Sequence, residues 1–192
     1  MAIHLGHTTF IGESFASLKL KEHSFGELVA DSVLYNSTSY LEEKKPEEIT
    51  AESPESYAAR GNCTEQGLIR FFLKQCGHSI IFTRQEERTA DKLLLYSIPF
   101  DSKYKMSFAV IQDTKNPKNV KIFGKGAPDF LLQYCTLVLN KDGAPVELTD
   151  DEKNKINHDV IKMNFAKKSY RTILTAYKEM PKEEFHELIG NP

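Results

Sequence analysis

Apolar and polar residues alternate with a period of two through much of the second half of the chain, a pattern that indicates β-strands. The clearest runs are residues 93–100, 105–113 and 120–123, with a turn-rich segment at 114–119. Consecutive strands with short links predict an antiparallel meander. Pro99 cannot donate a ladder hydrogen bond, so we expect the first of these strands to end there.

Apolar residues at helical spacing predict helices over residues 25–36, 64–76 and 149–168. The first and third begin with a capping box, in which a Ser or Thr is followed three residues later by Glu. We expect Thr64 to cap the second helix and Gly77 to end it.

The remaining segments carry weaker patterns. Short strands are predicted at 78–83, 137–139, 146–148 and 170–177, and irregular edge strands within residues 1–20. Residues 41–61 are charged and punctuated by proline, which predicts a mobile insertion. The amphipathic tail at 181–192 is expected to be ordered against a neighbouring domain.

Composition restricts the class of protein. The chain has 192 residues, 40% of them hydrophobic and 27% charged, which fits one soluble globular domain. A net charge of −2 gives no support for a nucleic-acid or membrane-surface role. We find no apolar run long enough to span a membrane and no signal-peptide pattern. The three cysteines lack metal-ligand spacing, so we expect reduced thiols in the cytosol and no metal site.

An aromatic ring and a lysine stand at the turn between the first two predicted strands. Phe100 is expected at the lip of the sheet, and Lys105 follows five residues later. A ring beside a cation suits a planar, anionic ligand, because the ring offers stacking and the ammonium offers charge. Alternatively, Phe100 is a core residue and Lys105 a solvated strand end.

A second candidate is Lys125, which lies between two glycines at a strand-to-helix junction before Pro128. The glycines allow the backbone to approach a bound group, and Pro128 suits the first turn of a helix over residues 129–135. The alternative is a tight turn with an exposed lysine. The segment lacks the spacing of a Walker loop.

Two further residues have both a structural and a functional interpretation. Glu65 lies in the first turn of a predicted helix, where the helix dipole favours a carboxylate, but it could also accept a hydrogen bond from an exocyclic amine. Arg171 opens the last predicted strand and could pair with phosphate, although such arginines are more often surface charges.

Four segments, in this order and at this spacing, resemble the nucleotide-binding domain of P-type cation-transporting ATPases. They are Thr64-Glu65, Ile98-Pro-Phe-Asp-Ser-Lys-Tyr-Lys105, Lys125-Gly-Ala-Pro-Asp129 and Tyr170-Arg-Thr172. The resemblance covers roughly residues 10–181 and is greatest to the plasma-membrane calcium-pump branch. The sodium–potassium and reticulum calcium pumps remain alternatives. Asp129 stands where the family usually has glutamate.

The resemblance implies a single nucleotide-binding domain over residues 1–192, with an α/β (α+β) fold of mainly antiparallel sheet flanked by helices. It implies that Phe100 stacks on adenine, that Glu65 accepts from its amino group, and that Arg171 meets the phosphates. The other implied pocket residues are Ser102, Lys105, Lys125, Gly126 and Ala127. We expect modest affinity, in the upper micromolar to millimolar range.

The resemblance also implies that nucleotide binding and catalysis lie on separate domains. The family phosphorylates an aspartate in an Asp-Lys-Thr-Gly-Thr motif on a separate domain, and this motif is absent from the 192 residues. We therefore expect no catalytic residue in this chain, which would bind ATP, as Mg-ATP in the parent pump, at the cytosolic face of a membrane. Its expected partners are the phosphorylation and actuator domains, with no direct membrane contact and no nucleic acid. A non-enzymatic interaction or regulatory module, whose lysine-rich rim meets an acidic partner, is the alternative.

Overall fold

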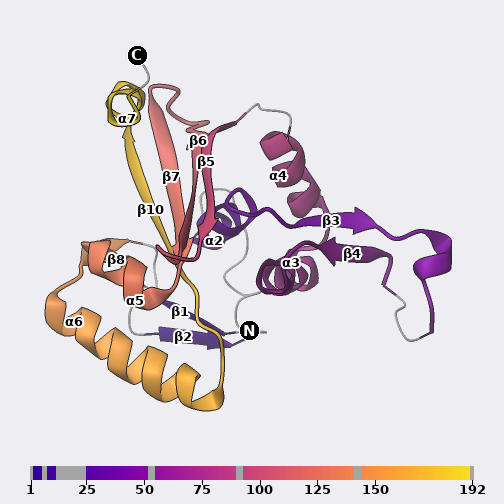
Figure 1. Cartoon of the computed structure of the whole chain (residues 1–192), viewed down its shortest axis with the longest axis horizontal. Coiled ribbons are helices and arrows are strands. Elements are labelled where there is room, and N and C mark those ends of the chain that lie inside the picture. The colour runs from indigo at the N-terminus through magenta and orange to yellow at the C-terminus, as the bar shows by residue number, and fades with distance from the viewer. Residues whose placement is uncertain are drawn as a thin grey trace.

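The centre of the molecule is a four-stranded antiparallel sheet in the order β10-β7-β6-β5 (Figure 1). A computed structural model describes residues 2–5, 8–11, 25–51, 55–89, 93–140 and 144–190. The sheet consists of β5 (Leu94–Asp101), β6 (Met106–Gln112), β7 (Asn119–Gly126) and β10 (Leu174–Pro181). The predicted meander is confirmed, and so is the α/β fold with antiparallel sheets flanked by helices.

Strand β5 continues two residues past Pro99, so the prediction that it ends there is wrong. Because β5 is an edge strand, the missing N–H of Pro99 leaves no gap in the ladder on the solvent side. Pairing passes from Ile98–Phe108 to Asp101–Met106, so three steps on β5 match two on β6. This bulge accommodates Pro99 and Phe100 beside Ser107.

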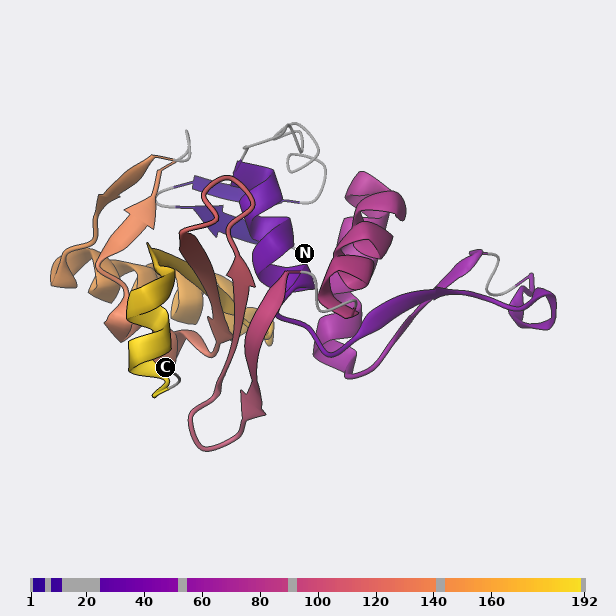
Figure 2. The same cartoon turned by 90° about the horizontal axis from the view of Figure 1, so that it is seen from above.

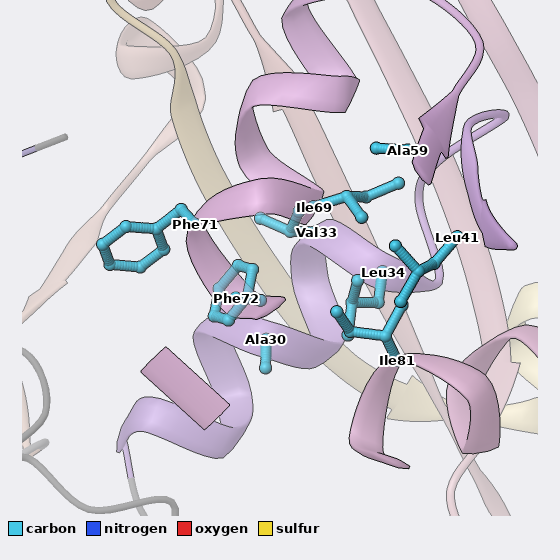
Figure 3. Close-up of a cluster of buried hydrophobic side chains, with 9 residues drawn as sticks. All are labelled: Ala30, Val33, Leu34, Leu41, Ala59, Ile69, Phe71, Phe72 and Ile81. Carbon is cyan, nitrogen blue, oxygen red and sulfur yellow. The ribbon is translucent and has the colours of Figure 1, made fainter. Parts of the chain in front are cut away.

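Three helices cover one side of the molecule: α2 (Phe25–Leu34), α3 (Cys63–Cys76) and α4 (Ser79–Thr89). Figure 3 shows their buried side chains gathered into one core. Its members are Ala30, Val33, Leu34, Leu41, Ala59, Ile69, Phe71, Phe72 and Ile81. Phe72 and Ile81 have no exposed surface, and burying each stabilises the fold by about 2–3 kcal/mol.

Helix α4 replaces the strand predicted at 78–83 and the polar link after it. The apolar run at 80–82 does not distinguish a strand from a buried helix. Beyond Phe82 the contacts of α4 are polar: Arg84 bonds to Asp31 at 2.7 Å, and Gln85 bonds to the backbone of Leu41. A helix that packs through arginine and glutamine gives no apolar periodicity, so the pattern missed it.

The predicted loop at 41–61 is instead a β-hairpin of β3 (Tyr40–Glu43) and β4 (Tyr57–Arg60), which corrects that interpretation. Leu41 and Ala59 attach it to the core, and Arg60 pairs with two glutamates, Glu42 at 2.6 Å and Glu48 at 2.7 Å. Figure 2 shows the hairpin extending away from the body of the molecule. A short 3-10 turn, η1 (Pro46–Glu48), follows β3.

The opposite face of the sheet is covered by the tail. Helix α7 (Lys182–Leu188) places Phe185 against Val110, Val120 and Met180. On the other face of the sheet, Phe123 of β7 packs in a cluster with Leu28 of α2 and stacks on Tyr35, the residue directly after that helix. The amphipathic tail is thus ordered against the sheet of its own chain.

The remaining elements lie at the periphery. They are β1 (Ala2–Leu5), β2 (Thr8–Ile11), α5 (Pro128–Leu131), η2 (Leu132–Tyr134), β8 (Leu137–Leu139), β9 (Pro145–Glu147), α6 (Asp150–Lys155), η3 (Ile156–Phe165) and η4 (Ala166–Lys168). The capping box predicted at the start of the third helix, Thr149 with Glu152, is confirmed. Ser24, the cap predicted for the helix over residues 25–36, lies outside the described residues. Across the described ranges, every helix is too short or too polar to span a bilayer.

Candidate functional site

Glu65 and Lys125, which come from distant parts of the sequence, form a buried ion pair. Lys125 Nζ lies 2.6 Å from Glu65 Oε1, and the two residues are 7% and 8% exposed. Helix α3 brings Glu65 to this position because Asn62, not Thr64 as predicted, caps the helix and accepts from the Glu65 N–H at 3.0 Å. Lys125 reaches the pair from β7.

The other oxygen of Glu65 is held by the segment that follows α2. Glu65 Oε2 accepts from the N–H of Thr38, from Thr38 Oγ1 and from the N–H of Ser39, each at 3.0 Å. Burial alone would raise the pKa of Glu65. The Lys125 charge and these hydrogen bonds outweigh burial and lower the pKa to about 2. The carboxylate is therefore ionised at neutral pH.

Lys125 also fastens α2 to the sheet. Its ammonium donates to the carbonyl of Asn36, while Asn36 Nδ2 donates to the carbonyls of Ser107 and Phe123 at 3.0 and 3.1 Å. Burial lowers the pKa of Lys125, an effect that the hydrogen bond it donates to Glu65 opposes. The alternative interpretation of an exposed lysine is therefore wrong, because Lys125 is buried with both a carbonyl and a carboxylate as partners.

Phe100 lies at the rim of the same sheet and is 60% exposed, so it is not a core residue. The turn after it is closed by Asp101, whose carboxylate accepts from the N–H groups of Lys103 and Tyr104 at 2.6 and 3.2 Å. Ser102 and Lys105 are exposed in this turn. The ring of Phe100 is therefore exposed at the rim of the sheet, as the sequence predicted.

Backbone contacts join this turn to the segment after Lys125. The N–H of Ala127 donates to the carbonyl of Lys105 at 3.0 Å. A Cβ on Gly126 would lie 2.5 Å from that carbonyl oxygen and 2.8 Å from Met106 Cγ. Gly126 is therefore required by the close approach of the protein's own turn.

Sheet register relates the two parts of the site. Ser107 pairs with Lys125, which pairs with Thr175, and the bulge places Phe100 beside Ser107. Neighbouring strands lie about 4.8 Å apart, so Phe100 and Lys125 belong to one row, two strand spacings apart. The structure thus brings together the Phe100 turn, Gly126, Ala127 and the Glu65–Lys125 pair.

Arg171 comes from the segment before β10 rather than from within the strand. It is exposed, and its Nη1 donates to Thr64 Oγ1 at 2.5 Å. Because Thr64 precedes Glu65, this contact brings the guanidinium to the N-terminus of α3, beside the buried pair.

The residues that support the Glu65–Lys125 pair, namely Asn36, Thr38 and Ser39, were not predicted from the sequence. They belong to a run of small polar residues at the end of the helix predicted over residues 25–36. Ser39 is 1% exposed, and buried polar residues need partners. The length of this polar run after an apolar helix was the available signal.

Comparison with known proteins decides the family. The family model described as "P-type ATPase, cytoplasmic domain N" matches residues 24–191. The chain belongs to the P-type ATPase N-domain family. The plasma membrane calcium-transporting ATPase mca-1 of Caenorhabditis elegans is 31% identical over 125 residues, 64% of this chain. A probable plasma-membrane-type calcium-transporting ATPase 9 of Oryza sativa subsp. japonica is 29% identical over 158 residues, 81% of this chain.

These relatives support the resemblance to the plasma-membrane calcium-pump branch of the family. The aligned regions are 10% and 14% of the two relatives' lengths. This N domain therefore corresponds to a small part of each relative.

Proposed function

We propose that this N domain binds ATP between the Phe100 turn and the Glu65–Lys125 pair. The observation that carries the proposal is the row in which exposed Phe100 stands two strand spacings from Lys125. An aromatic plate with an acid and cations nearby suits an adenine ring and its phosphates. The family membership supports nucleotide binding in general.

In this proposal Phe100 stacks on adenine, and Glu65 accepts from the amino group. Lys105 and Lys125 line the pocket, and Arg171 meets the phosphates from its place beside Thr64. Ser102 hydrogen-bonds nearby, and the backbone of Gly126 and Ala127 borders the base or ribose. Because Lys125 is paired with Glu65, a ligand that bonds to Glu65 Oε1 competes with the ammonium for it.

We further propose that residues 1–192 form one such domain of a larger calcium-transporting pump at the cytosolic face of a membrane. The names of the two relatives support the calcium assignment. The domain would hold Mg-ATP so that its γ-phosphate reaches an aspartate of the phosphorylation domain, with the actuator domain as a further partner. Residues 181–192 would lead towards the phosphorylation domain. Such transfer depends mainly on positioning and electrostatic stabilisation.

Calorimetric titration with ATP tests the binding proposal. We expect Phe100→Ala to weaken ATP binding roughly tenfold, because stacking on one base contributes about 1–3 kcal/mol. Leu188→Ala, which removes an exposed side chain from α7 at the other end of the sheet, is the control and should bind as the wild type does. Equal affinity of the wild type and Phe100→Ala would refute the assigned site.

A further inference from the structure

Arg88 lies in the last turn of α4, and its guanidinium holds the segment that follows α2. Its Nη1 donates to the carbonyls of Leu34, at 3.2 Å, and Ser37, and its Nη2 lies 3.4 Å from the carbonyl of Ser39. Arg84, one turn earlier, instead pairs with carboxylates, Asp31 at 2.7 Å and Glu87 at 3.1 Å. The two arginines therefore have different roles.

One peptide group connects Arg88 to Glu65. The Ser37 carbonyl accepts from Arg88, and the Thr38 N–H of the same peptide donates to Glu65 Oε2 at 3.0 Å. The cation lies at the negative end of the peptide dipole and the anion at its positive end, so the dipole favours both contacts. Bonds arranged in such a chain strengthen one another.

This arrangement gives the two oxygens of Glu65 different tasks. Oε2 is held by three donors from Thr38 and Ser39, whereas Oε1 bonds to Lys125. A donor on a ligand can replace the single contact of Lys125 with Oε1 more readily than it can replace the three donors that hold Oε2. Oε1 is thus the oxygen available for recognition.

We propose that Arg88 is a positioning residue for recognition of the adenine amino group, acting through the Ser37–Thr38 peptide on Glu65. The inference rests on the proposed function, in which Glu65 contacts that amino group. Arg88 does not touch the ligand. It fixes the segment that turns Oε1 towards the base.

The test compares ATP with ITP, which carries a carbonyl in place of the amino group. We expect Arg88→Met to weaken ATP binding roughly fivefold, the effect of losing one well-aligned hydrogen bond, and to leave ITP binding unchanged. Arg88→Lys should give a ratio of ATP affinity to ITP affinity between those of the wild type and Arg88→Met, because an ammonium cannot bridge several carbonyls as the guanidinium fork does. Arg70→Met, which removes an exposed arginine from α3, is the control and should leave the ratio unchanged.

A second readout is the pKa of the Glu65 carboxyl, which carbon-13 NMR measures in the wild type and in Arg88→Lys. Arg88→Lys is the milder variant and is used should Arg88→Met fail to fold. A raised Glu65 pKa in Arg88→Lys supports the positioning role. A ratio of ATP affinity to ITP affinity that equals the wild-type ratio, in whichever Arg88 variant folds, overturns it whatever the Glu65 pKa. If the wild type binds no ATP, the proposed function fails and the recognition role of Arg88 fails with it, and the Glu65 pKa then tests only whether Arg88 positions the carboxylate.

Discussion

Lys125 Nζ lies 2.6 Å from Glu65 Oε1, and this contact joins the first turn of α3 to the end of β7. The pair therefore serves the fold as well as the proposed site. Any ligand that binds Glu65 or Lys125 exchanges a structural contact for its own. Modest affinity is the expected consequence.

Removing one member of the pair leaves a buried charge without its partner. We expect Lys125→Met to lower the free energy of unfolding by about 3 kcal/mol, because a broken buried ion pair typically costs about 3–5 kcal/mol and Thr38 and Ser39 still hold Glu65. Urea denaturation measures this. Adding Glu65→Gln should recover part of the loss, and exposed Lys118→Met should change little. A loss no larger than that of Lys118→Met would contradict the buried pair.

The pair also predicts how stability changes in acid. The pKa of Glu65 falls from its ordinary value of 4.5 to about 2 in the folded chain. A lowered pKa stabilises the fold above the unfolded value, by about 3 kcal/mol here, and this contribution is lost as the pH falls from about 4.5 to about 2. Urea denaturation at several pH values should show this loss in the wild type and a smaller one in Glu65→Gln. Equal acid sensitivity of the two proteins would argue against it.

Asp31 has the opposite effect on stability. Burial raises its pKa from 3.8 to about 6, although Arg84 opposes the shift and Glu27 and Glu87 add to it. Its contribution is complete below pH 3.8 and is lost as the pH rises through about 6, a change of about 3 kcal/mol. We expect the melting temperature to rise between pH 7.5 and 5 in the wild type and to vary less in Asp31→Asn. A profile unaltered by Asp31→Asn would contradict this assignment.

Local signals predicted most of the sheet and the helices that follow a cap or precede a glycine. Apolar and polar residues alternate clearly in β6 and β7, and the capping box of Thr149 and Glu152 marks the start of α6. The failures have local physical reasons. Helix α4 packs partly through polar side chains, and among the paired residues of the 41–61 hairpin Leu41, Ala59 and Tyr57 pack against the core.

Substitutions at Gly126 and Gly67 distinguish a glycine required by close packing from one that only adds backbone freedom. Gly126→Ala should destabilise the fold by about 2 kcal/mol or more, since its Cβ would lie 2.5 Å from the Lys105 carbonyl. Gly67→Ala is the matched control. It lies inside α3 with nothing within 4 Å of its Cβ, so we expect a gain of about 0.5–1 kcal/mol. Thermal unfolding of both variants measures the contrast, and a tolerated Gly126→Ala would contradict the described turn.

The candidate site was predicted less completely than the fold. Family resemblance identified Glu65, Phe100 and Lys125, and the structure brings Glu65 and Lys125 into contact. Their mutual pairing, and the support from Thr38 and Arg88, depend on contacts between residues far apart in sequence. Periodicity and capping rules describe neighbours along the chain, so they carry no information about such contacts.

The most direct test of ATP binding at this site is a proton–nitrogen NMR titration of the chain with ATP. We predict shifts of the backbone signals of Phe100, Lys105 and residues 125–127, together with Glu65 and its support at Thr38. Shifts confined to the groove between β5 and α7, lined by Tyr96, Phe185 and His186, or no shifts at millimolar ATP, would contradict the account.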